Sequence, residues 1–166
     1  MSNLATCKHR GFSLIELSVA TAIFSMGLGS LSMMMLATVQ GTAEAHHHTV
    51  ATSQAESMAE MIAMSSDAYG HYVFPVDAPV ITCNEHPCSD GAMAAANVAF
   101  WQRHLGEELP GGSGLVCRDS TPDDGKPADA SCDDSGSLVI KVFWEETRHA
   151  NAAGGGLRRV VTRLPW

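Results

Sequence analysis

Apolar residues are distributed unevenly along the chain, and their spacing predicts elements of different kinds. Residues 17–43 carry no formally charged side chain and consist mainly of aliphatic residues, methionine, alanine and glycine. This segment is longer than the roughly 20 residues that cross a hydrocarbon layer as a helix. It predicts a membrane-spanning helix, whose serine and threonine hydroxyls are expected to bond back to helix carbonyls.

The same helix is expected to continue to about Ser66. Residues 44–67 contain no proline and no glycine. An apolar stripe recurs there at helical spacing: Ala51, Ala55, Met58 and Ile62. A helix from Phe12 to Ser66 would be on the order of 80 Å long at about 1.5 Å per residue. We expect its first half to be apolar on every side and its second half to pack on a domain through the stripe.

Shorter elements joined by turns follow residue 70. Asp90 is predicted to cap a second helix that runs to about Leu109. Its expected inward residues are Met93, Ala96, Phe100 and Leu105, with Trp101 beside them. Strands are expected at 115–117, 138–145 and 157–164, the last two as an antiparallel hairpin. Alternation places one apolar face on the middle strand: Leu138, Ile140, Val142 and Trp144.

These elements predict an α+β fold, in which a long N-terminal transmembrane helix packs against a small antiparallel sheet with a second short helix. The chain has 166 residues, of which 45% are apolar, so it has room for about one modest domain besides the membrane segment. The net charge is −8 and the ten lysines and arginines are scattered, which argues against nucleic-acid binding.

No cofactor, metal site or enzymatic activity is expected. His46, His47 and His48 would point in three directions from a helix, so solvated histidines are favoured over metal ligands. The acidic run 119–134 is interpreted as solvated turns, with a calcium site as the alternative. No nucleophile and base occur at a telling spacing.

A short polar leader precedes the apolar helix, and the junction reads RGFSLIEL over residues 10–17. Basic residues precede the helix and the first acids follow it, which predicts a cytoplasmic N-terminus and an exported C-terminal domain. A secretory signal peptide fits poorly, because its apolar stretch is about 7 to 15 residues long and ends at a small-residue cleavage site. A plain anchor leaves Glu16 unexplained, since a carboxylate in a membrane costs roughly 2.5 to 3.5 kcal/mol.

Gly11, Phe12 and Glu16 at this spacing, ahead of an uninterrupted apolar helix, resemble the class III signal of type IV pilins and pseudopilins. The resemblance implies that a prepilin peptidase cuts after Gly11 and methylates Phe12. It also implies that Glu16 pairs with the N-terminal amine of a neighbouring subunit during assembly, whereas the alternative is that Glu16 only snorkels at the membrane face. The chain then divides into a leader (1–11), a transmembrane and filament-core half of the helix (12–43) and a periplasmic head (44–166).

Further motifs are similar to those of minor pilins of the PilV type: LPGGSGLVC at 109–117, CRDSTPDDG at 117–125 and RRVVTRLPW at 158–166. The resemblance implies a protein of the bacterial inner membrane, and later of the pilus, that helps to prime pilus assembly. Its implied partners are the prepilin peptidase, other minor and major pilins, the inner-membrane assembly platform, membrane lipid and a tip adhesin. A minor pseudopilin of type II secretion and a single-pass binding protein are the alternatives.

Cys7 would leave with the leader, so four cysteines remain in what would be an oxidising compartment. Four cysteines allow three pairings. We favour Cys83 with Cys88, across a turn, and Cys117 with Cys132, closing a loop rich in aspartate, proline and glycine. A zinc site is the competing interpretation, but the spacing lacks a Cys-x-x-Cys pair.

Overall fold

The computed structural model describes residues 11, 13–76, 88–146 and 156–165. The chain divides into two compact units, Met1–Ala43 and Glu44–Trp166. Helix α1 (Leu14–Met64) contributes residues 14–43 to the first unit and residues 44–64 to the second. The arrangement of elements is α+β and pilin-like, as predicted.

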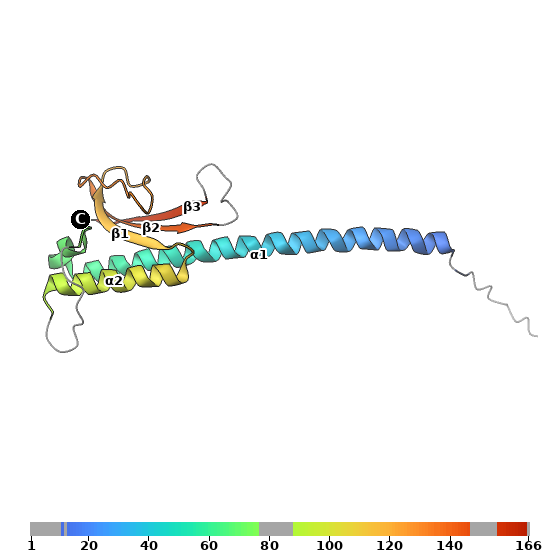
Figure 1. Ribbon diagram of the computed structural model, residues 1–166, viewed down its shortest axis with the longest axis horizontal. Helices are drawn as coiled ribbons and strands as arrows, with labels where there is room; N and C mark the ends of the chain where they lie inside the picture. Colours follow the sequence, from blue (N-terminus) through green and yellow to red (C-terminus); the bar gives the residue numbers. More distant parts are fainter. Residues whose placement is uncertain (1–10, 12, 77–87, 147–155, 166) are drawn as a thin grey trace, which may run out of the picture. The chain divides into compact units, whose positions relative to one another are not determined.

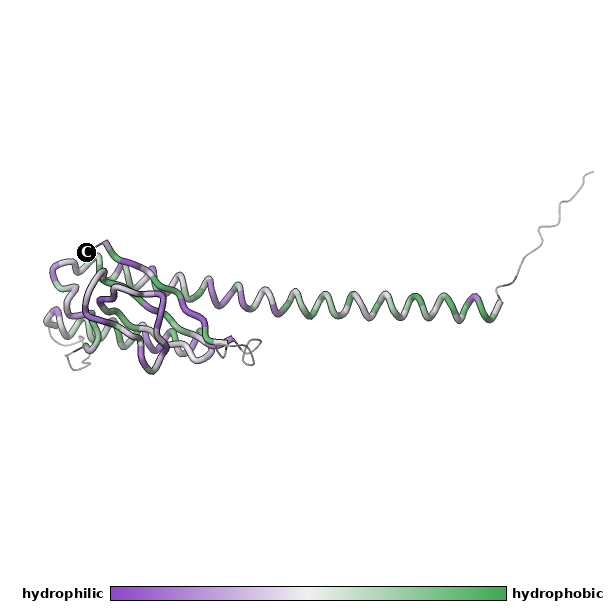
Figure 2. The backbone as a smooth tube through the Cα atoms, turned by 90° about the horizontal axis from the view of Figure 1, so that it is seen from above, coloured by the Kyte–Doolittle hydropathy of each residue, from purple (hydrophilic) through white to green (hydrophobic). Residues whose placement is uncertain are grey.

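The described helix of the first unit is apolar over most of its length, as the hydropathy colouring of Figure 2 shows. Its small polar residues do not interrupt the helix, because each hydroxyl donates to a carbonyl three or four residues earlier at 2.7 to 3.0 Å. The residues are Ser18, Thr21, Ser25, Ser30, Ser32 and Thr38. These bonds confirm the expected back-bonding and remove unpaired donors that would oppose burial in lipid.

The second unit is a three-stranded antiparallel sheet with helices on one face (Figure 1). The strands are β1 (Ser113–Asp119), β2 (Ser137–Glu145) and β3 (Leu157–Arg163), and β2 is central. Ile140 lies opposite Val116 on one side and Thr162 on the other. Residues 44–64 of α1, the 3₁₀ helix η1 (Ser66–Tyr72) and helix α2 (Asp90–Glu108) complete the unit.

The core lies between these helices and the sheet. All four residues of the predicted α1 stripe are fully buried: Ala51, Ala55, Met58 and Ile62. The predicted inward face of β2 is buried in the same cluster: Leu138, Ile140, Val142 and Trp144. Trp101 of α2 joins them, and its indole Nε1 donates to the carbonyl of Gln54 at 2.9 Å. An indole can be buried without cost only when its N–H has such an acceptor.

Helix α2 differs from the prediction in its cap and in its buried face. Ser89, not Asp90, is the N-cap, and its side chain accepts from the backbone N–H of Ala92 at 3.3 Å. The predicted inward residues Met93 and Phe100 are 43% and 55% exposed. The buried face instead comprises Ala92, Ala94, Ala95, Val98, Trp101 and Leu105. The face is rotated by about one residue because Trp101, and not Phe100, occupies the core.

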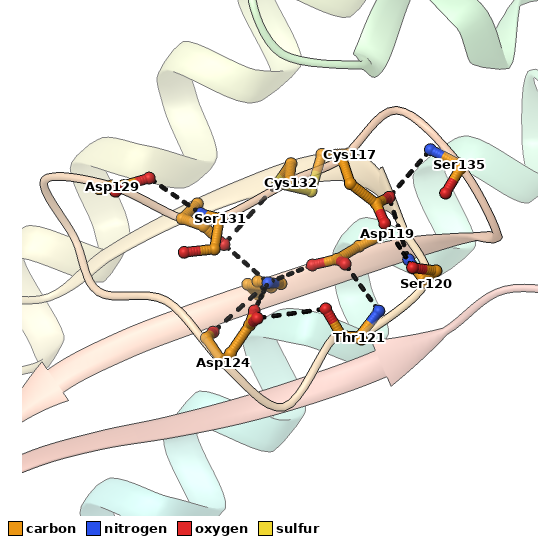
Figure 3. The surroundings of a disulfide bond; sticks show 12 residues. Cys117, Asp119, Ser120, Thr121, Asp124, Asp129, Ser131, Cys132 and Ser135 are labelled. Atoms are coloured by element: carbon orange, nitrogen blue, oxygen red, sulfur yellow. Dashed lines mark hydrogen bonds and ion pairs between the residues drawn. A yellow bond between two sulfur atoms is a disulfide. The ribbon is translucent and has the colours of Figure 1, made fainter.

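The opposite face of the sheet is also covered, which the sequence pattern did not predict. Val139, Lys141 and Phe143 point away from the helices by alternation, and all three are fully inaccessible. The segment 120–136 crosses over this face of the strands (Figure 3). A sheet buried on both sides explains why β2 is apolar at nearly every position.

Candidate functional site

The prepilin-like motif lies at the beginning of α1. Gly11 is exposed, and the helix starts three residues later at Leu14. Glu16 lies in the first turn and is exposed, where the helix dipole favours a negative charge. Phe12 lies outside the described residues, so its exposure as a new N-terminus stays a prediction.

Nothing in the described fold requires a glycine at position 11. A Cβ atom added to Gly11 would meet no atom within 4 Å, apart from the chain neighbours. A side chain there would therefore be tolerated by the described residues. A requirement for glycine at this position would come from a partner that handles this segment.

By its length and composition, helix α1 is long and apolar enough to cross a membrane. Its large apolar side chains between residues 14 and 39 are all at least half exposed within the chain. Exposed apolar surface on this scale needs lipid or other helices around it. The helix and the motif together fit an inner-membrane anchor.

In the head, a disulfide and several hydrogen bonds order the segment between β1 and β2. Cys117 and Cys132 form a disulfide that closes it, as predicted (Figure 3). Asp133 accepts from the Ser120 hydroxyl and from the backbone N–H groups of Ser120 and Ser135. These hydrogen bonds, the one from the Ser120 side chain above all, lower the pKa of Asp133 to about 2. The carboxylate therefore orders the loop as an anion at any ordinary pH.

Cys117, Asp119 and Cys132 have side-chain atoms within 4.8 Å of one another, a grouping that could suggest a metal site. The two sulfurs are bonded to each other, so neither can act as the thiolate ligand that zinc needs. Cys83 lies outside the described residues. Its pairing with Cys88 therefore stays a prediction.

The three consecutive histidines do not behave alike. His47 Nδ1 lies 2.9 Å from Glu146 Oε1, and the indole Nε1 of Trp144 donates to the same oxygen at 2.9 Å. The side chain of His47 is only 23% exposed, so the expectation that it is solvated was wrong. Burial would raise the pKa of Glu146, but the hydrogen bonds from His47 and Trp144 outweigh it and hold the pKa below its ordinary value. The contact fixes the end of β2 to residues 44–64 of α1.

Sequence reasoning missed a charged cluster made by the buried residues Lys141 and Asp119 and the half-exposed Asp124. Lys141 Nζ forms an ion pair with Asp119 Oδ2 and lies 3.2 Å from Asp124 Oδ1. The sequence offers a lysine inside the otherwise apolar run 138–144, but this indicates burial of the lysine only once both faces of the strand are known to be covered.

In a comparison with protein families, residues 6–32 fit the family model described as the prokaryotic N-terminal methylation motif. The matched segment contains the predicted cleavage position at Gly11 and the carboxylate of Glu16. No curated protein and no solved structure matches the chain. The chain thus has a type IV pilin-like prepilin N-terminus, which supports a general role as a pilin or pseudopilin.

Proposed function

We propose that this chain is a minor type IV pilin, which helps to prime pilus assembly at the bacterial inner membrane and is incorporated into the pilus or its tip complex. The observation that carries the proposal is the methylation motif at the start of a long apolar helix. A pilin needs both features, because the motif is processed in the membrane and the helix then packs in the filament. The protein acts as a structural subunit and not as an enzyme.

Processing comes first in the proposed sequence of events. The prepilin peptidase cuts between Gly11 and Phe12 on the cytoplasmic side, and Phe12 is methylated. Residues 12–43 then hold the subunit in the bilayer while the head, residues 44–166, lies in the periplasm. The new amine is largely cationic at neutral pH, so it attracts a carboxylate.

Assembly follows when the helix leaves lipid for a bundle of pilin helices. Glu16 would be an unpaired charge there unless it met a cation, and the amine of a neighbouring subunit supplies one. The partners are therefore other minor and major pilins, the assembly platform in the inner membrane and a tip adhesin.

Mass spectrometry of the N-terminus of the membrane form tests the processing step. We expect the wild-type chain to begin at methylated Phe12 and Gly11→Leu to retain residues 1–11. Gly27→Leu is the matched control, because a Cβ meets nothing within 4 Å at either glycine, and it should be processed normally. An intact Met1 on the wild-type chain would contradict the proposal and favour a single-pass anchored binding protein.

A minor pseudopilin of type II secretion is the second candidate, because the methylation motif supports either role. The two candidates differ in their neighbouring subunits. Cross-linking in membranes and identification of the attached pilins separates them. Attachment to pilus subunits supports the first candidate, whereas attachment to secretion pseudopilins supports the second.

A further inference from the structure

Lys141 and Asp119 face each other in the covered layer beneath segment 120–136. Lys141 lies within β2 and Asp119 ends β1, and both side chains have no exposed surface. We propose that these residues become joined by an intramolecular amide bond between Lys141 Nζ and Asp119 Cγ. The proposal rests on the geometry of the head and does not depend on the proposed function.

The hydrogen bonds of Lys141 leave Asp119 in contact but not hydrogen-bonded. Nζ lies 2.7 Å from the carbonyl oxygen of Ala130, and 3.2 and 3.4 Å from Oδ1 and the carbonyl oxygen of Asp124. These acceptors match the three donors of an ammonium group. Asp119 Oδ2 touches Nζ, yet it has no partner with hydrogen-bond geometry among the described residues. Nζ of Lys141 thus lies against the carboxyl group of Asp119, while its hydrogen bonds go to Ala130 and Asp124.

The remaining contacts of Asp119 suit attack on its carboxyl carbon. The backbone N–H of Thr121 donates to Asp119 Oδ1 at 2.8 Å. A fixed donor on this oxygen stabilises the negative charge that develops there when a nucleophile adds to Cγ. Oδ2, on the side of Nζ, is left as the oxygen that departs.

Asp124 is placed to move the protons. Oδ1 of Asp124 is within hydrogen-bond distance of Lys141 Nζ. Asp124 can therefore accept a proton from the nitrogen and pass it to Oδ2 of Asp119, the oxygen that leaves. Its side chain is 49% exposed, in contrast to Asp119 and Lys141, so it connects the buried pair with solvent. Asp124 is thus the candidate catalytic residue.

The condensation balances without any other reactant. The Nζ–Cγ bond forms and the Cγ–Oδ2 bond breaks. Starting from ammonium and carboxylate, nitrogen gives up two protons, which leave with Oδ2 as one water molecule. No electron is transferred. Two buried charges disappear, which removes the desolvation penalty of the pair. The product keeps one N–H, and the carbonyl oxygen of Ala130, 2.7 Å from Nζ before the reaction, is its nearest acceptor.

The test is the intact mass of the full chain, extracted in detergent and measured after denaturation and reduction of disulfides. We expect the mass to be lower by one water than the sequence of the processed chain requires. A protease that cleaves before aspartate separates residue 119 from residue 141 along the backbone. The two peptides should nevertheless stay linked, and trypsin should fail to cut after Lys141.

Lys141→Arg is the matched variant, because it keeps the charge but lacks the amine, and it should show the full mass. Asp124→Asn should form the link more slowly. Loss of water from Asp124–Gly125 by cyclisation of the aspartate gives the same mass change, but it leaves peptides 119 and 141 unlinked and persists in Lys141→Arg. That result, or full mass with a free Lys141 in the folded wild-type chain, would overturn the proposal.

Discussion

At Gly114 in β1, helix α2 leaves no room for a side chain. A Cβ atom there would overlap the Trp101 ring and lie 2.7 Å from Leu105 Cδ1. Both neighbours are fully buried, so neither can move into solvent. The glycine therefore allows an indole to pack directly on the backbone of the strand.

We expect Gly114→Ala to destabilise the head by about 1 to 3 kcal/mol, because overpacking forces a buried ring out of place. Urea denaturation of the detergent-solubilised chain, followed by tryptophan fluorescence, measures the effect. Gly70→Ala is the control, since a Cβ at Gly70 meets nothing within 4 Å, and it should lie within about 0.5 kcal/mol of wild type. Equal losses for both variants would show that packing at Gly114 is not the cause.

Glu146 gives stability that depends on pH. Its folded pKa lies below the ordinary value of 4.5, so its contribution is complete above that value and is lost as the pH falls through the folded pKa. We expect Glu146→Gln to cost about 1 to 3 kcal/mol at pH 7, because the hydrogen bonds of His47 and Trp144 then lack a charged acceptor. The gap between wild type and variant should narrow below about pH 4.5.

Thermal unfolding of both chains at several pH values measures this gap. Glu145→Gln, at the exposed neighbouring position, is the control and should change stability little. A gap for Glu146→Gln that stays constant down to pH 3 would contradict the assigned role of the carboxylate.

The disulfide-closed segment between β1 and β2 adds a cover to the face of the sheet that the helices leave open. It turns the outer face of β2 into interior, so that Val139, Lys141 and Phe143 are buried. Arg159 of β3 donates to the carbonyl of Gly125 at 2.8 Å and so ties the segment to the third strand. The segment thus acts as a third layer without regular secondary structure of its own.

Replacing Cys117 and Cys132 together by serine should destabilise a chain that lacks the amide by about 3 kcal/mol, the loop-entropy value for a closed loop of this size. Denaturant unfolding under non-reducing conditions measures the loss. Lys141→Arg supplies the chain without the amide. In the wild-type chain, an amide between residues 119 and 141 would already restrict the segment, so the loss of stability there should be smaller. An unchanged midpoint in both backgrounds would mean that the loop is ordered without the bridge.

Sequence patterns correctly predicted the buried faces of elements with a regular apolar period. They failed where the buried face depends on side-chain size or on a distant segment that covers the sheet. The α1 stripe and the helix-facing side of β2 follow simple periods, and both were predicted correctly. In α2 the alanine-rich sequence has little contrast between faces, so the choice between Phe100 and Trp101 depended on a tertiary hydrogen bond to Gln54. The cover over Lys141 could not be predicted, because irregular loops have no period.

The prepilin-like motif could be recognised from the sequence for the opposite reason. Gly11 and Glu16 belong to a short motif that a processing enzyme must read, so the signal is local in the sequence. The contact of His47 with Glu146 joins residues 99 positions apart, so no local sequence pattern predicts it.

For the whole molecule, residues 14–43 need a different environment from the head, and Glu16 lies where that apolar segment begins. In lipid the carboxylate can stay near the headgroups, but in a bundle of helices it needs a cation. Under the proposed function, the same residue is tolerable in the membrane and becomes useful on assembly.

We therefore expect Glu16→Ala to be processed and inserted normally but to fail in assembly. Loss of one member of a buried charge pair can cost about 3 to 5 kcal/mol. The measurements are cleavage state, membrane level and incorporation into sheared pili or the priming complex. Ser18→Ala, nearby on the same helix, should assemble normally. Wild-type incorporation of Glu16→Ala would leave snorkelling at the membrane face as the role of this residue.

The bridge between Cys117 and Cys132 also sets how far the chain can stretch when its ends are pulled apart. The two cysteines are 15 positions apart, which corresponds to roughly 50 Å of fully extended backbone at about 3.4 Å per residue. While the sulfur–sulfur bond is intact, tension passes from β1 through the bridge to the residues just before β2. The segment between the two cysteines then carries no tension and cannot be extended. In a chain without the amide between residues 119 and 141, such as Lys141→Arg, reduction would release this segment, so the disulfide and the proposed amide together determine the contour length of the head under load.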